Sequence, residues 1–268
     1  MKNSIFRNLK LNIGLIILAV MIILILASLF YTPYDPDVMD PYAKFTGMSA
    51  EHILGTDHYG RDIYSRLIIG MRTTLIIALI TNGIGVIVGT IIGSLTGYFG
   101  GVLDETVMRI NDALLSFPSI LIALVIIAMV GPGTYQTTIA MGIVFIPSYA
   151  RIIRSEFLKC KNMDYVRSAK VMGASPLRIM FVHILPNVRK TLSSSLIIGF
   201  NNAVLCEAAM SFLGIGVQPP NASLGLMLSE AQSYIFMKPS YAITIGLAIA
   251  LMILGFALLS DGLGEKNA

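Results

Sequence analysis

Long stretches without a charged side chain recur along this chain of 268 residues. Uncharged runs cover residues 11–30, 73–103, 113–150 and 239–260, and a further run, from Thr191 to about Phe212, is interrupted only by Glu207. About 20 apolar residues cross the hydrocarbon core as a helix, so each run predicts one span and the longest predicts two. Gly131-Pro132-Gly133 provides the turn at which the longest run folds back. The pattern predicts an all-α membrane protein with six transmembrane helices.

Composition supports a membrane location, because 55% of the residues are hydrophobic, only 13% are charged and the mean hydropathy is +0.77. These values exclude a soluble globular domain. The first uncharged run follows basic residues, as in a signal peptide, but is too long for a typical cleaved signal, so we expect an uncleaved anchor. Cys160 and Cys206 are expected in different compartments, which argues against a disulfide between them.

The distribution of Lys and Arg predicts the orientation. With a cytoplasmic N-terminus, 14 of the 19 basic residues lie on the cytoplasmic side: Lys2, Arg7, Lys10, Arg109, nine between Arg151 and Lys190, and Lys266. The reverse orientation would place the most basic loop outside, against the positive-inside rule. Both termini are therefore expected in the cytoplasm. The net charge of +4 follows from this loop bias and does not indicate nucleic-acid binding.

This topology divides the chain into three regions. We expect an anchor helix with an extracytoplasmic loop over residues 1–72, a five-helix core over 73–260 and a short cytoplasmic tail over 261–268. The core contains a basic cytoplasmic loop at about residues 160–190.

A row of glycines marks the second span. Gly85, Gly89, Gly93 and Gly97 recur every four residues, so they share one slowly drifting helix face without side chains. Such a face lets a neighbouring helix backbone approach closely in lipid. The neighbour is either another helix of this chain or a moving partner helix. Gly100-Gly101 is expected to end the span, since glycine suits the position beyond the last helical turn.

Few polar groups lie where chemistry would need them. Glu207 is the one acidic residue inside an apolar run, which makes it a functional candidate, although it lies near the outer end where water or headgroups reach. A structural role at the outer mouth and a role in the translocation pathway both remain open. Asn201 and Asn202, nearer the middle of the span, are expected to line a polar cavity or to bond across helices.

The outer loop holds the only cluster that could bind a metal ion, His52 and His58 with Asp57. The spacing of six residues fits no common zinc pattern, so we expect no metal site. Whether these histidines or Glu207 contact a substrate stays open.

Residues 165–187 form a basic, helix-forming segment with a Gly-Ala-Ser-Pro break at 173–176. Two short helices joined at a glycine make a compact knob suited to docking into another protein. The chain has no Gly-x-x-x-x-Gly-Lys-Ser/Thr phosphate loop, no His-Glu-x-x-His and no Gly-x-Ser-x-Gly motif. We therefore expect a non-catalytic membrane subunit; if it moves solutes actively, ATP is hydrolysed on another chain.

Four stretches carry a family resemblance. They are Leu54-Gly-Thr-Asp57 with Gly60-Arg-Asp62, Gly97-Tyr-Phe-Gly-Gly101, the segment ending in Leu185-Pro186-Asn187 with Ala169 and Gly173, and Ser211 to Pro220. Together they resemble the inner-membrane permeases of the dipeptide/oligopeptide/nickel family of ABC importers. Arg167 stands where the coupling-loop pattern has Glu, Leu224 stands where the family often has Trp, and the chain stops soon after Asp261-Gly-Leu263.

The resemblance implies a type I ABC-importer permease fold with a cytoplasmic coupling helix-loop-helix, in the cytoplasmic (inner) membrane of a bacterium. It implies a second homologous permease chain, two cytoplasmic ATPase subunits that bind ATP and Mg, an extracytoplasmic solute-binding protein, and no cofactor on this chain. The implied ATPase-coupling residues are Arg167, Ala169, Lys170, Gly173, Ala174, Ser175 and Pro176. Of these, Ala169 is expected to face the ATPase groove. The effect of Arg167 in place of Glu stays open.

The substrate also stays open between di- or oligopeptides, nickel and metal-chelate complexes. The alternative functions are a membrane channel, an ATP-independent transporter subunit and an intramembrane enzyme. A channel would not need an ordered helix-loop-helix, and an enzyme would need a paired nucleophile and base that the sequence does not offer.

Overall fold

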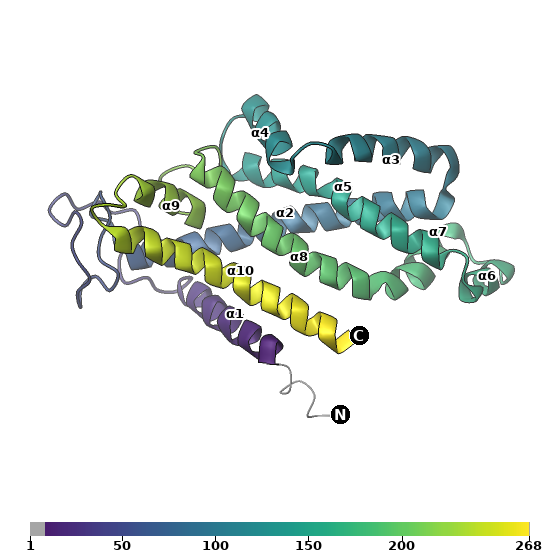
Figure 1. Cartoon of the computed structure of the whole chain (residues 1–268), viewed down its shortest axis with the longest axis horizontal. Coiled ribbons are helices and arrows are strands. Elements are labelled where there is room, and N and C mark those ends of the chain that lie inside the picture. The colour runs from purple at the N-terminus through teal and green to yellow at the C-terminus, as the bar shows by residue number, and fades with distance from the viewer. Residues whose placement is uncertain (1–8, 268) are drawn as a thin grey trace.

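The computed structural model describes residues 9–267, with side chains to residue 262. Its helices are α1 (Leu9–Ala27), α2 (Ile63–Phe99), α3 (Gly101–Leu115), α4 (Ser119–Val130), α5 (Thr134–Cys160), α6 (Asp164–Val171), α7 (Pro176–Arg178), the π-helical segment η2 (Ile179–Ile184), α8 (Leu185–Phe212), α9 (Leu224–Gln232) and α10 (Pro239–Asn267). No β-strand occurs within the described range. The long helices run roughly alongside one another (Figure 1), which confirms the all-α prediction.

Among the described residues, four helices are long and apolar enough to cross a membrane: α1, α2, the continuous Pro176–Phe212 unit and α10. The pair α3 and α4, bent by 91°, could form a fifth span together. The sequence predicts six spans, and the predicted span that is missing from these five is α5. Its 27 residues reach about 40 Å, but its polar first turn and its arginines keep it below the hydropathy of the other spans. Composition alone therefore supports four or five spans, and the sixth rests on the length and packing of α5.

Helix boundaries follow local signals. Gly131 and Gly133 adopt positive φ values of 89° and 153° in the turn between α4 and α5, so the longest run folds back where expected. Gly100 separates α2 from α3, also as expected. The Asp62 side chain accepts a hydrogen bond from the Ser65 backbone N–H (2.8 Å) and caps α2. Helix α2 therefore crosses the boundary expected at residue 72, and α10 continues through the expected cytoplasmic tail.

The glycine row on α2 lies against α5 of the same chain. A Cβ atom added to Gly85, Gly89 or Gly97 would lie 2.5–2.8 Å from the Cβ of Phe145, Tyr149 or Phe157 on α5. Added at Gly93, it would be 3.0 Å from the Arg154 backbone nitrogen. No side chain fits at these distances, so the row lets α2 and α5 pack as one closely fitted pair.

At one end of the bundle, residues 31–62 and α9 form a unit that we call the outer cap. At the opposite end, residues 164–184 form a second unit, which we call the cytoplasmic knob (Figure 1). Both names follow the orientation that the distribution of Lys and Arg predicts. Helix α1 begins, and α10 ends, on the side of the bundle that faces the knob. Helices α1 and α10 lie side by side, where a Cβ on Gly14 would be 2.9 Å from the Gly255 carbonyl oxygen.

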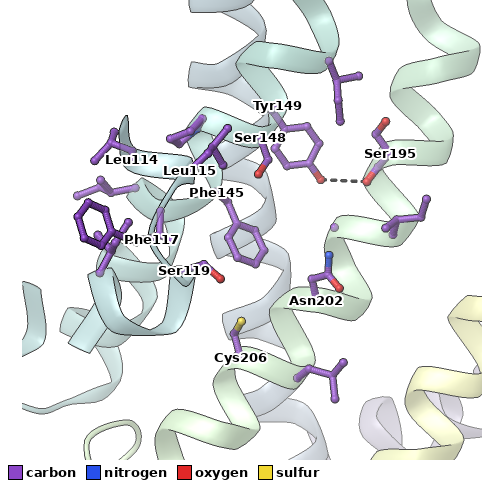
Figure 2. A pocket seen from close by; sticks show the side chains of 18 residues that line it. Leu114, Leu115, Phe117, Ser119, Phe145, Ser148, Tyr149, Ser195, Asn202 and Cys206 are labelled. Atoms are coloured by element: carbon purple, nitrogen blue, oxygen red, sulfur yellow. Dashed lines mark hydrogen bonds between the residues drawn. The ribbon is translucent and has the colours of Figure 1, made fainter. Parts of the chain in front are cut away.

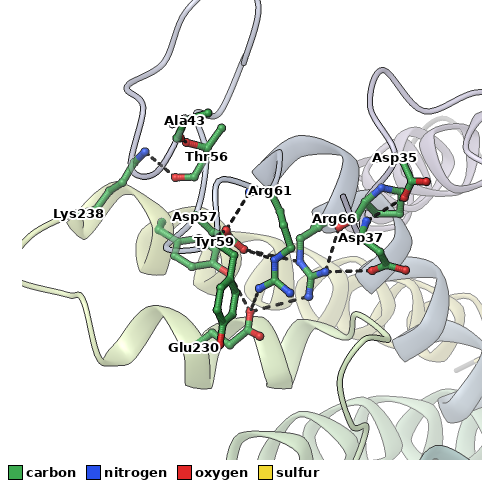
Figure 3. A network of polar contacts seen from close by, with 12 residues as sticks. Asp35, Asp37, Ala43, Thr56, Asp57, Tyr59, Arg61, Arg66, Glu230 and Lys238 are labelled. Atoms are coloured by element: carbon green, nitrogen blue, oxygen red, sulfur yellow. Dashed lines mark hydrogen bonds and ion pairs between the residues drawn. The ribbon is translucent and has the colours of Figure 1, made fainter. Parts of the chain in front are cut away.

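The outer cap is held by a buried ion network (Figure 3). The Arg61 guanidinium lies 2.7 Å from Asp57 Oδ2 and 2.9 Å from Glu230 Oε2 of α9. Arg66 is fully buried, 3.8 Å from Glu230 and 3.3 Å from Asp37. These contacts join segments that are far apart in sequence, and both buried arginines lie within 4.0 Å of carboxylates.

Candidate functional site

A cavity of about 500 Å³ lies between α5 and α8, closed on one side by the turn between α3 and α4. Its polar lining consists of hydroxyl, amide and thiol groups from Ser119, Ser148, Tyr149, Ser195, Asn202 and Cys206 (Figure 2). The rest of the lining is apolar, mainly leucine, isoleucine and phenylalanine, and the lining includes no charged side chain and no histidine. A mostly apolar cavity with a few converging polar groups is typical of a small-solute site.

The two candidate asparagines differ in position. Asn202 faces the cavity, whereas Asn201 does not line it. The Asn201 Oδ1 atom is buried and has no hydrogen-bond partner among the described residues. Asn202 is therefore the one that can reach a solute in this cavity.

Glu207 lies outside the cavity, and the expectation that water or headgroups solvate it is wrong. Its side chain is fully buried, and its carboxylate accepts hydrogen bonds of 2.7 Å from the hydroxyls of Thr74 on α2 and Ser211 on α8. Those hydroxyls in turn accept from the backbone N–H groups of Leu224 and Val217. The Glu207 carboxylate thus connects α2 and α8 to the segment that leads into α9. This arrangement supports a structural role for Glu207.

The histidines of the outer cap already have protein neighbours. His52 Nδ1 lies 2.9 Å from Asp62, while Asp57 is held by Arg61. The His58 ring stacks on Tyr234 at 4.9 Å, and burial lowers the pKa of His58. Burial also lowers the pKa of Lys238, whose ammonium donates to the carbonyl oxygen of Thr56 at 2.9 Å. Over the described residues, no three His, Cys, Asp or Glu side chains gather closely enough to hold a metal ion.

The cytoplasmic knob is a helix, a turn and a second helix. Gly173 has φ +81° at the turn, and the Ser175 hydroxyl accepts from the Arg178 backbone N–H and caps α7. Val166, Ile179, Met180 and Ile184 form its buried core together with Ile153 and Phe157 of α5. The break expected at residues 173–176 is therefore the place where the chain turns.

One expectation about the knob is wrong. Ala169 is only 2% exposed and packs inside the knob, so it cannot face a partner's groove. Its small side chain instead lets α6 lie close to η2. The exposed tip consists of Val171 (89% exposed), Met172 (78%) and Leu177.

The remaining coupling candidates lie around this tip. Arg167 is exposed, 3.9 Å from Asp164 of the same helix. The Lys170 ammonium lies 5.4 Å from the centre of the Tyr98 ring on α2. Ala174 is half-buried, and Ser175 and Pro176 are exposed.

The sequence analysis missed several residues of the cavity. Ser148, Tyr149, Ser195 and Cys206 line it, yet they fall in runs that carry only a span signal. Pro147-Ser148-Tyr149 and Ser193-Ser194-Ser195 are polar interruptions of those runs, and beside Asn202 they are a local signal that points to the cavity.

A helical bundle with an uncharged cavity and an exposed knob at one end is the architecture of a membrane transport subunit. A family model described as "Binding-protein-dependent transport system inner membrane component" matches residues 89–265. This chain belongs to that family and is a permease subunit of an ABC importer, as the sequence analysis predicted.

Curated relatives extend this similarity over almost the whole chain. The dipeptide transport system permease protein DppC of Haemophilus influenzae is 38% identical over 260 residues, covering 94% of this chain and 88% of that protein. The glutathione transport system permease protein GsiD of Pectobacterium atrosepticum is 38% identical over 249 residues, covering 91% and 83%.

Solved structures show the same fold at low identity. An inward-facing structure of the MetNI methionine ABC transporter matches with a TM-score of 0.61 and 18% identity, over 76% of this chain and 96% of that one. A crystal structure of an amino acid ABC transporter with histidines matches with a TM-score of 0.56 and 19% identity, over 76% and 94%. The predicted type I permease fold is confirmed.

Proposed function

We propose that this chain lines the path of di- or oligopeptides, or of related small solutes, through the membrane together with a second permease chain. The cavity between α5 and α8 is the observation that carries the proposal. Its hydroxyl and amide groups can donate to and accept from peptide groups, and its lack of charge would let peptides with different side chains pass. The relatives named for dipeptide and glutathione transport support this substrate class.

The cavity favours a peptide over a bare nickel ion. Nickel requires imidazole, thiolate or carboxylate ligands, and Cys206 is the only side chain of that kind in the lining. A nickel ion enclosed in a chelate would present its organic ligand instead, so a metal-chelate remains the second candidate.

The cytoplasmic knob supports the proposed ATPase contact. The apolar tip of Val171, Met172 and Leu177 is exposed to solvent, whereas the knob's own core is already filled. Exposed apolar side chains on a small folded unit are typical of a protein interface. We place two ATPase subunits, with their ATP and Mg, against this knob and its counterpart on the second permease chain, and we assign no cofactor and no catalytic step to this chain.

The two ends of the bundle fit the proposed orientation. The knob and the described ends of α1 and α10 would lie in the cytoplasm, and the outer cap would face the extracytoplasmic binding protein. The excess of basic residues in the knob and its flanks supports this direction.

Cys206 provides the test, because it is a natural thiol in the cavity lining. In a Cys160→Ser chain assembled with its partners in proteoliposomes, we expect a small water-soluble thiol reagent to label Cys206. Labelling should differ between the nucleotide-free and the vanadate-trapped complex, and a transported dipeptide should slow it. The matched control is Cys206→Ser with Cys160 retained. Labelling that is absent in both states, or that ignores nucleotide and peptide alike, would show that this cavity is not the pathway.

A further inference from the structure

Two side chains tie α8 to both α2 and α5 in the half of α8 nearer the knob. Tyr149 of α5 is buried, and its hydroxyl lies within hydrogen-bond distance of Asn82 Oδ1 on α2 and 3.1 Å from the Ser195 carbonyl oxygen on α8. Asn82 Nδ2 donates to the Leu196 carbonyl oxygen at 2.9 Å. Figure 2 shows the Tyr149 ring directed from α5 at Ser195. Two consecutive carbonyl groups of α8 are thus held by side chains from two other helices.

This contact requires a glycine at position 199. A Cβ atom on Gly199 would overlap the Tyr149 hydroxyl oxygen and lie 2.6 Å from Asn82 Oδ1. Any side chain there would push α8 away from α2 and α5 or displace the tyrosine. Gly83, the neighbour of Asn82, has no such constraint, since a Cβ there would meet no atom within 4 Å.

The contact joins two parts of the bundle that differ in how they pack. The glycine row fits α2 and α5 closely together, whereas the cavity separates much of α5 from α8. Over residues 9–262, the Tyr149–Ser195 hydrogen bond is the only one between a side chain of α5 and the helix α8. Tyr149 is also one of the residues that line the cavity. It is therefore placed where it can set the distance between the two walls.

We propose that Tyr149, Asn82 and Gly199 form a latch that sets the separation of the α5 and α8 walls and that yields each time the cavity changes shape. In this role they are positioning residues. Two ordinary hydrogen bonds bias an equilibrium between two conformations but are weak enough to break in every transport cycle. The inference rests on the proposed pathway, and it adds the residues that control the shape of that pathway.

The test measures Cys206 labelling in the Cys160→Ser chain with Tyr149→Phe. This change removes the hydroxyl and keeps the ring that packs against Gly85. Losing the bias of the latch should change the labelling rate of the nucleotide-free complex about three- to tenfold. The ratio between the nucleotide-free and vanadate-trapped rates should move toward one. Gly199→Ala, which displaces the latch sterically, should shift the ratio in the same direction.

Two matched controls make the same changes elsewhere in the bundle. Tyr135→Phe takes a hydroxyl from an exposed tyrosine of α5, and Gly83→Ala adds a methyl group where there is open space. Both should keep the wild-type ratio. A residue with a merely structural role would lower the yield or the melting temperature of the complex without moving this ratio.

The possible outcomes test the proposed latch and the proposed pathway separately. If wild-type Cys206 labelling depends on the state and Tyr149→Phe behaves like Tyr135→Phe, the latch is overturned and the pathway stands. A Tyr149→Phe chain that fails to assemble would also overturn the latch, since a contact that opens in every cycle cannot be required for folding. If Gly199→Ala fails to assemble, Tyr149→Phe alone decides.

Discussion

The outer cap and the cytoplasmic knob are attached to opposite ends of the same bundle, but different forces hold them. In the cap, Arg61 and Arg66 are buried against Asp57 and Glu230. In the knob, aliphatic side chains such as Val166 fill a small core, and the charged side chains point outward. The cap thus pairs its buried arginines with its own carboxylates, whereas the knob leaves apolar side chains exposed at its tip.

This difference indicates different mechanical roles. Buried ion pairs depend on geometry, because any opening leaves a charge in an apolar environment, so the cap is expected to move as a rigid body. An apolar core tolerates small sliding movements, and an exposed apolar tip gains by contact with another surface. A rigid surface for a soluble partner at one end and an adaptable docking knob at the other fit the two ends of an importer subunit.

The largest expected effect comes from breaking the ion network of the cap. Glu230→Gln leaves Asp57 as the one carboxylate beside Arg61 and leaves Arg66 with Asp57 and the half-exposed Asp37. Breaking a buried ion pair costs about 3–5 kcal/mol. We expect a large drop in the melting temperature of the purified complex in detergent. The matched control is Glu105→Gln, which breaks an exposed Glu105–Arg109 pair on α3 and should cost under about 1 kcal/mol. Equal melting temperatures for the two variants would show that the network does not hold the cap.

A smaller effect is expected from overfilling the knob. Ala169→Leu adds bulk to a closed core and should cost about 1–3 kcal/mol, with loss of ATPase co-purification as a consequence. Ser168→Leu adds the same side chain one residue earlier, on the exposed face of α6, and should leave the melting temperature unchanged. If Ala169→Leu blocked ATPase docking at a wild-type melting temperature, Ala169 would face the partner after all.

Much of the fold could be predicted because its signals are local. Uncharged runs marked the spans, and the glycines at 100, 131 and 173 lie where the chain turns with positive φ. The second uncharged run begins only at residue 73, whereas α2 begins at Ile63, directly after its N-capping residue Asp62. Charged and polar side chains in the first turns of α2 make the helix longer than the uncharged run.

The sequence analysis was wrong or silent about side chains whose neighbours come from distant parts of the chain. Glu207 is satisfied by Thr74, which is 133 positions away in sequence. Arg61 reaches Glu230 across 169 positions. Ala169 faces inward because η2 folds back over α6, and a helix of eight residues is too short for its periodicity to reveal the buried face. Such pairings depend on tertiary packing, which a single sequence does not encode locally.

The smallest expected effect is a pH dependence of the stability of the cap, because the cap buries the titratable ring of His58 beside its ion network. The ring of His58 lies between Tyr59 and Tyr234, and its Nδ1 is buried without a hydrogen-bond partner among the described residues. Burial lowers the pKa of His58. The positive charges of Arg61 and Arg66 lower this pKa further, whereas the negative charges of Asp57 and Glu230 oppose the shift. In the unfolded chain the pKa returns to its ordinary value of 6.5.

Between the lowered pKa and 6.5, the unfolded chain binds a proton at His58 that the folded chain does not bind. The stability of the cap should therefore be fully present above about pH 6.5 and should decline as the pH falls below it. We expect the melting temperature of the purified complex to fall between about pH 7.5 and pH 5.5 by more in the wild type than in His58→Gln. His52→Gln is the matched control, since it removes the other histidine of the cap and keeps His58. If His58→Gln lost as much stability over this range as the wild type, another group would be the one that titrates.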